Sequence, residues 1–295
     1  MTGGTGLVAG IGVRGPATVD PGVLAALGLA GVGYAGAVAI RWRRRRRLPV
    51  RRRHVVGFAA GLAVLVVALA SPLDGLAAQR FAPHMVQHLL LMLVAAPLIV
   101  SGRPATVLLA AIPPGRRRAL HRATSTGGWR ALTAALAHPV VVWVLGTAAL
   151  WAWHFPTLYD LALRNDAVHA VEHATFLGTA ALFWGLVIGA GRRRSPTARP
   201  VALALTFATA LASSALGAAL TFATAPLYPV QAARAAAAGV SPLEDQQLAG
   251  VLMWVPPGVI YLVTMATLLV RWFNELDARP DRDAHSPSFL AEPVR

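Results

Sequence analysis

The chain has 295 residues, of which 56% are hydrophobic and only 13% are charged. Soluble domains carry about 25% charged residues. The apolar residues come in runs of about 18–24, long enough to cross a bilayer core of roughly 30 Å, so composition excludes a large soluble protein. The chain has no cysteine, so any metal site must use His, Met or carboxylate ligands instead of thiolates.

We predict an all-α fold, a polytopic membrane helix bundle with about seven transmembrane helices. In chain order the predicted spans are 21–41, 54–71, 84–101, 138–154, 168–190, 200–223 and 247–270. Residues 104–113 are apolar but too short to span. We therefore expect 103–137 to form a cytoplasmic loop with one or two interfacial helices.

The expected domain organisation is simple, because no soluble domain interrupts the spans. Residues 1–20 form an N-terminal outer segment, and 21–274 form the transmembrane domain. Residues 275–295 are polar and contain proline, which favours a disordered cytoplasmic tail. Any function must therefore lie in the bundle or in its short outer loops.

All 27 basic residues are arginine, and the net charge of +15 could indicate a nucleic-acid surface. Their distribution indicates membrane topology instead, because cytoplasmic loops of membrane proteins hold the excess of arginine. With the N-terminus outside, 23 arginines fall on the inner side, and the four on the outer side are Arg14, Arg80, Arg164 and Arg234. We predict an N-out, C-in protein whose partner is the lipid bilayer and not nucleic acid.

Five histidines fall at one depth under this topology, near the outer interface. The third and fifth spans run inward and the fourth runs outward, which places together His84, His88, His154, His169 and His173. Two of the spacings are i, i+4, and such residues lie one turn apart on the same helix face. Two imidazoles so placed can ligate one metal ion. The alternative is that interfacial histidines form hydrogen bonds between helices.

Other polar and sulfur groups accompany these histidines. Asp74 and Glu172 could orient a metal-bound imidazole by accepting its second N–H. Met85, Met92 and Met253 carry thioethers soft enough for Cu(I), although packing in the core is the usual role of methionine.

Several motifs agree in order and spacing with one known family. They are 71–74 (SPLD), 84–92 (HMVQHLLLM), 101–104 (SGRP), 153–159 (WHFPTLY), 169–173 (HAVEH), 245–250 (DQQLAG) and 253–254 (MW). Over about residues 50–275 the chain resembles the multi-span cytochrome c oxidase assembly factor CtaG family.

The resemblance implies a non-enzymatic factor in a bacterial plasma membrane. It would assist copper delivery to a haem–copper oxidase of the caa3 kind and have cytochrome c oxidase subunits as partners. Carried over by position, the polar motif residues are His84, His88, His154, His169, His173 and Asp245. That these residues bind copper is a hypothesis, with zinc as the alternative metal.

Two other functions stay open on the residues alone. A seven-helix zinc-dependent hydrolase of lipid amides would also use paired histidines and an acid to activate water. A b-type haem membrane protein would use histidines on facing helices as axial ligands.

Overall fold

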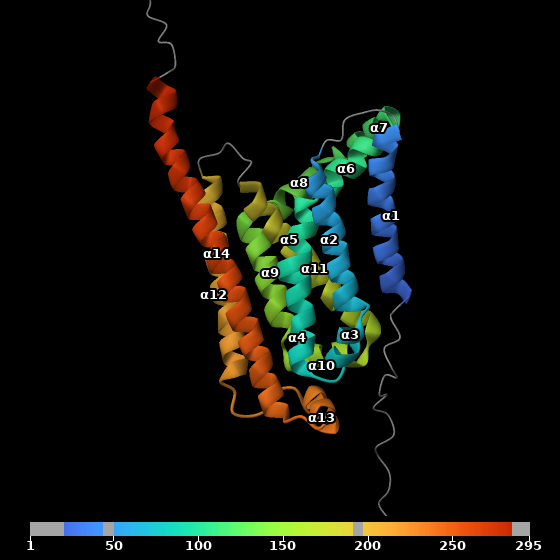
Figure 1. Cartoon of the computed structure of the whole chain (residues 1–295), viewed down its shortest axis with the longest axis vertical. Coiled ribbons are helices and arrows are strands. Elements are labelled where there is room, and N and C mark those ends of the chain that lie inside the picture. Colours follow the sequence, from blue (N-terminus) through green and yellow to red (C-terminus); the bar gives the residue numbers. More distant parts are fainter. Residues whose placement is uncertain (1–20, 44–49, 191–196, 285–295) are drawn as a thin grey trace, which may run out of the picture.

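The computed structural model describes residues 21–43, 50–190 and 197–284, and within these ranges every regular element is a helix (Figure 1). This confirms the predicted all-α fold. Six helices are long and apolar enough to cross a membrane, and a bent pair gives a seventh if it is taken as one span. The chain is therefore a multi-pass membrane protein with six to seven candidate spans.

The six long helical segments match six of the predicted spans. They are α1 (Pro21–Arg43), α2 (Arg52–Leu69), the continuous segment Phe81–Ala111, α11 (Asp166–Ala190), α12 (Ala198–Thr221) and α14 (Pro242–Ala284). The remaining predicted span corresponds to α9 (Pro139–Trp153), whose axis is bent by 70° from α8 (Gly127–Leu136). At 1.5 Å per residue α9 alone is about 22 Å long, shorter than a bilayer core.

The third span is a composite of several helical pieces. It begins with α4 (Phe81–Leu89), continues through a π-helical turn, η1 (Leu90–Ala95), and ends in α5 (Ala96–Ser101). The indole Nε1 of Trp184 on α11 donates a hydrogen bond of 2.9 Å to the carbonyl of Met92 within η1. Single π-turns inside α-helices occur frequently at functional sites, and this one begins two residues after His88.

Residues 103–137 contain three helices instead of the predicted one or two. These are α6 (Pro104–Ala111), α7 (Pro114–Thr124) and α8. Pro104 and Pro114 each occupy the first turn of a helix, where the missing N–H costs nothing. Arg103, the residue before Pro104, has a left-handed backbone with φ of 53° that ends the preceding helix.

Helix α14 also continues beyond the predicted end of the last span. It extends to Ala284, so residues 275–284 continue the last helix, and the predicted disorder of the tail stays a prediction. Glu275 is held in this extension by an ion pair with Arg199 of α12. The rest of the tail, and the N-terminal segment 1–20, lie outside the described residues.

The two ends of the bundle differ in their short helices (Figure 1). One end carries α3 (Pro72–Ala77), α10 (Pro156–Arg164) and α13 (Pro229–Ala237), and the opposite end carries the arginine-rich α7. Helices α12 and α14 pack closely because glycines face each other where they cross. A Cβ on Gly250 would lie 2.5 Å from the backbone nitrogen of Thr221, and one on Gly217 would lie 2.9 Å from the Cβ of Trp254. Small residues permit such backbone approach between membrane helices.

Candidate metal centre

The position of α4 is set by a carboxylate from the other end of the chain. Asp245, in the first turn of α14, is 5% exposed. Its Oδ2 accepts a hydrogen bond from the backbone N–H of Phe81, and its Oδ1 accepts one of 3.1 Å from Ala82. A carboxylate at a helix N-terminus satisfies unpaired N–H groups and interacts favourably with the helix dipole. Asp245 therefore ties α14 to the start of the helix that carries His84 and His88.

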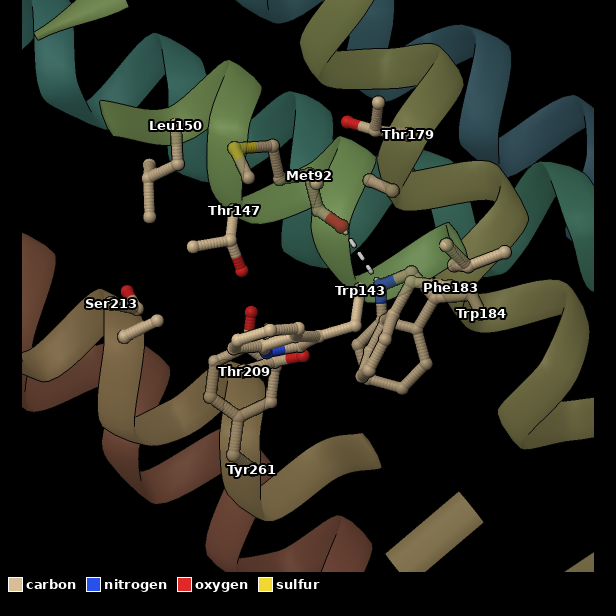
Figure 2. Close-up of a pocket in the computed structure, with 14 residues that line it drawn as sticks. Met92, Trp143, Thr147, Leu150, Thr179, Phe183, Trp184, Thr209, Ser213 and Tyr261 are labelled. Atoms are coloured by element: carbon tan, nitrogen blue, oxygen red, sulfur yellow. Dashed lines mark hydrogen bonds between the residues drawn. The ribbon is translucent and has the colours of Figure 1, made fainter. Parts of the chain in front are cut away.

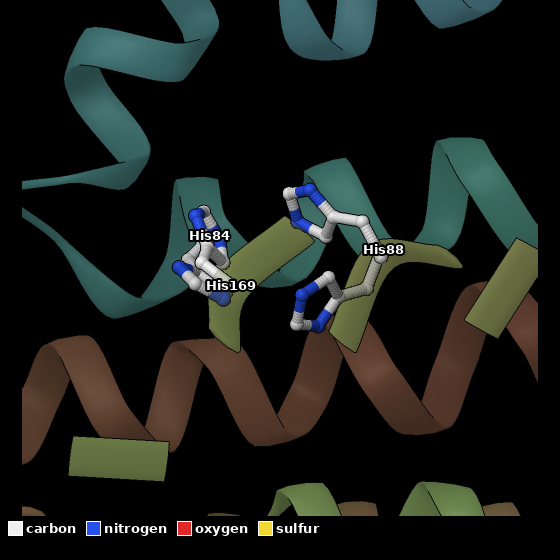
Figure 3. A group of neighbouring side chains, drawn as sticks. His84, His88 and His169 are labelled. Atoms are coloured by element: carbon white, nitrogen blue, oxygen red, sulfur yellow. The ribbon is translucent and has the colours of Figure 1, made fainter. Parts of the chain in front are cut away.

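Four of the predicted histidines meet between two helices, and Figure 3 labels three of them, His84, His88 and His169. His84 and His88 extend from α4, and His169 and His173 extend from α11. One ring nitrogen from each of the four lies within 4.8 Å of the others. The ring centroids of His84 and His169 are 5.2 Å apart, and those of His88 and His173 are 5.3 Å apart. Each i, i+4 pair thus faces the other pair across the helix interface.

The unsatisfied ring nitrogens of His88 and His173 suit a metal ion. Among the residues that the structure describes, neither ring nitrogen of His88 has a hydrogen-bond partner, nor has Nε2 of His173. Buried polar atoms are normally hydrogen-bonded. A bound metal ion would explain why these nitrogens have no hydrogen-bond partner. With metal–nitrogen bonds of about 2.0 Å, tetrahedral ligands lie about 3.3 Å apart. The rings would therefore need to close by at most about 1.5 Å, which side-chain rotation can supply.

Burial differs between the two sides of the group. His84 and His88 are 1% and 3% exposed, whereas His169 and His173 are only partly buried. His169 and His173 are therefore the more exposed pair of the group.

A carboxylate lies next to the four-histidine group and is fully buried. Oε1 of Glu172 is 3.7 Å from Nε2 of His88, and neither carboxylate oxygen has a hydrogen-bond partner within the described ranges. An acid buried inside a membrane is costly and is usually functional. A cation bound by His88 would offset that cost. The sequence suggested Glu172 as a possible partner of a metal-bound imidazole, and its position agrees with that role.

His154 lies near this group but does not belong to it. It follows the last residue of α9, and its ring centroid is 6.3 Å from that of His88. Its Nδ1 is 2.7 Å from the carbonyl of Leu150, and its Nε2 is 3.4 Å from Sδ of Met85. The hydroxyl of Tyr228 donates a hydrogen bond of 2.8 Å to the His154 carbonyl. The structure therefore gives His154 a different set of neighbours from the one that the sequence predicted.

Asp74 contacts a glutamine and not a histidine. The side-chain nitrogen of Gln87 donates to Oδ1 of Asp74 at 2.9 Å and to the carbonyl of Ala68 at 2.7 Å. These bonds join α4 to α3 and to the end of α2. Asp74 thus helps to fix the helix that bears two of the four histidines.

Tyr159, in α10, was not singled out from the sequence, although it ends the WHFPTLY motif. Its ring is 5.4 Å from that of His84, and its buried hydroxyl has no hydrogen-bond partner in the described part of the chain. Burial raises the pKa of Tyr159 well above its usual value, so the phenol keeps its proton. The sequence signal that could have identified Tyr159 is the preceding Trp-His-Phe-Pro segment, because a turn there would bring the next residues back against the bundle.

The fold and the site define a multi-pass helical membrane protein with four histidines gathered between two of its helices. The family described as cytochrome c oxidase caa3 assembly factor (Caa3_CtaG) matches residues 32–275. The chain belongs to this family, as its motifs predicted. The family is one of assembly factors and not of enzymes.

Mycobacterial proteins described as uncharacterized are similar to the chain. One from Mycobacterium bovis and one from Mycobacterium tuberculosis are each 28% identical over 277 residues, which cover 88% of this chain and 41% of the relative. One from Mycobacterium leprae is 26% identical over 270 residues, covering 87% of this chain and 40% of the relative. The chain thus spans about two fifths of the length of these relatives. No solved structure matches it.

Proposed function

We propose that this chain assists the assembly of a haem–copper cytochrome c oxidase by binding copper at the four-histidine group and passing it on. The observation that carries the proposal is the convergence of four imidazoles from α4 and α11, with one nitrogen of each within 4.8 Å of the others. Imidazole suits copper and zinc alike. The family's role in oxidase assembly favours copper, because that enzyme is itself a copper protein.

The site lies where an exported metal ion could reach it. The arginine-rich α7 lies towards one end of the bundle, and α4, which contains His84 and His88, lies towards the opposite end (Figure 1). If arginine marks the cytoplasmic side, the histidines face the outside, and the chain is N-out and C-in. The bacterial origin of the similar proteins supports a plasma-membrane location, and oxidase subunits would be the receiving partners.

The alternatives that the sequence left open fit this geometry less well. Haem needs room for a porphyrin between its axial ligands, but the cavity bordered by His88 and His154 has a volume of only about 20 Å³. A zinc hydrolase needs an open coordination position for water, whereas four imidazoles here can fill a tetrahedral site. A delivery site must release its ion, and the partly exposed His169 and His173 offer the exit.

The test is metal titration of the full-length protein, purified in detergent, with Cu(I), Cu(II) and Zn(II). We expect the His84→Ala/His88→Ala double variant to lose one bound metal per chain. The matched control is His121→Ala, because His121 is exposed and lies on α7. A second variant, His169→Ala/His173→Ala, should give the same loss from α11. Monodispersity and helical circular dichroism report folding. Unchanged stoichiometry in both folded double variants would overturn the proposed site.

A further inference from the structure

Nε2 of His154 and Sδ of Met85 are in contact, and neither atom carries a hydrogen that it could donate to the other. A carbonyl oxygen can only accept a hydrogen bond, so Nδ1 of His154, 2.7 Å from the Leu150 carbonyl, carries the ring proton. The neutral imidazole then has its lone pair on Nε2. That atom is 3.4 Å from Sδ of Met85, and a thioether has no hydrogen to donate. Two electron-pair donors therefore point at one another.

Two electron-pair donors at this separation are arranged as ligands of one metal ion would be. A metal-bound histidine almost always donates its other N–H to a carbonyl, carboxylate or water, which fixes the ring and its tautomer. The bond to Leu150 supplies that anchor for His154. Both side chains are buried, with His154 5% exposed and Met85 0% exposed. The Nε2 lone pair is therefore shielded from bulk water.

The space around this pair is rich in sulfur. A cavity of about 20 Å³ is bordered by Met85, Met92 and Met253 together with His88 and His154. Such a volume holds about one water-sized sphere, and a bare metal ion is no larger. Three of the five methionines of the chain thus line one small cavity. Packing alone does not require three methionines to gather beside two histidines.

A second cavity adjoins the first, and Figure 2 shows the residues that line it. It has a volume of about 50 Å³ and shares Met92, Leu150, Ser213 and Tyr261 with the smaller cavity. Thr147, Thr209 and Ser213 are among the residues that line it (Figure 2). The sulfur-lined cavity is therefore a junction between the four-histidine group and a partly polar interior.

We propose that Met85 Sδ and His154 Nε2 form a second, Cu(I)-selective site, with His88 as a ligand shared with the four-histidine group. Thioethers favour Cu(I) over the harder Cu(II) and Zn(II). Because His88 borders the cavity and belongs to the four-histidine group, an ion can pass by ligand exchange while one Cu–N bond is kept. Copper stays Cu(I) throughout, so no electron donor is needed. The passage of copper between the sites rests on the proposed function, whereas the second site does not.

The first measurement needs no variant. Full-length protein in detergent is loaded with Cu(I) under reducing, anaerobic conditions, and X-ray absorption at the copper edge reports the ligands. We expect two Cu(I) per chain and a Cu–S contribution to the scattering. Protein loaded with Zn(II) should show nitrogen and oxygen ligands only. Absence of Cu–S scattering in the wild type would overturn the second site.

Variants then separate the two sites. Met85→Leu conserves volume in the core, and we expect it to remove the Cu–S signal and weaken one Cu(I) by at least about tenfold. Its matched control is Met265→Leu, because Met265 does not line the cavity. His84→Ala/His169→Ala leaves His88 in place and should abolish Zn(II) binding but keep the Cu–S signal. Loss of Zn(II) binding with no effect of Met85→Leu refutes the second site alone. Intact Zn(II) binding in His84→Ala/His169→Ala refutes the four-histidine site.

Discussion

Replacement of Asp245 tests how the chain positions its histidines. The Asp245 carboxylate accepts the backbone N–H groups of Phe81 and Ala82 at the start of α4. Loss of an N-terminal cap costs about 0.5–2 kcal/mol, and a hydrogen bond to a charged group contributes about 1.5–3 kcal/mol. Because the two bonds share one carboxylate, we expect Asp245→Ala to lower the free energy of unfolding by about 2–4 kcal/mol. Asp245→Asn keeps one acceptor oxygen and should lose about half as much.

The assay is thermal unfolding of purified protein in detergent, followed by metal titration. A loss of this size corresponds to a decrease in melting temperature of roughly 3–7 °C for a chain of this length. Metal affinity should also fall, because the first turn of α4 frays and His84 and His88 lose their fixed position. Glu244→Ala is the matched control, since Glu244 is the exposed neighbour in the same helical turn.

Two results would refute this reasoning about Asp245. An unchanged melting temperature together with unchanged metal affinity would mean that the carboxylate does not hold α4. An unchanged melting temperature with loss of metal would mean that Asp245 is itself a ligand, as the sequence predicted. Only a joint loss of stability and affinity supports a positioning role.

Two further predictions concern the packing of the bundle and the charge beside the histidines. Gly250→Leu should prevent the close packing of α12 on α14 and greatly reduce the yield of monodisperse protein, because even a Cβ would lie 2.5 Å from the Thr221 nitrogen. Gly28→Leu is its control, with nothing within 4 Å of the added Cβ, and equal yields would contradict the packing argument. Glu172→Gln keeps the shape of the side chain but removes its charge, and should weaken metal binding by about 10–100-fold. The same change at Glu244 should have no effect, and equal affinities in the two variants would deny Glu172 a role.

The sequence was sufficient to predict the spans and the faces of single helices. Apolar runs located six of the seven spans, and the i, i+4 spacing placed His84 with His88 and His169 with His173. Both features are local, since they depend on residues within one helix. The loop at 103–137 was less predictable, because prolines restarted short helices within a stretch that hydropathy describes only as too short to span.

Contacts between distant segments could not be predicted from the same patterns. Asp245 was recognised as a motif residue, but its bonds to Phe81 and Ala82 join positions more than 160 residues apart. The depth of His154 suggested one site of five histidines. Its ring instead turns towards Met85, because the Leu150 carbonyl one turn earlier holds Nδ1. Such directions are set by packing between helices, which hydropathy and spacing do not contain.

We propose that the four-histidine group supplies copper during oxidase assembly. The decisive measurement is the copper content of purified cytochrome c oxidase. The oxidase comes from a strain that lacks this gene and expresses either the wild-type chain or the folded His84→Ala/His88→Ala variant. We expect a full copper complement with the wild type, a copper-deficient and inactive oxidase with the variant, and restoration of activity when copper is added to the medium. A fully metallated, active oxidase in the variant strain would contradict the claim.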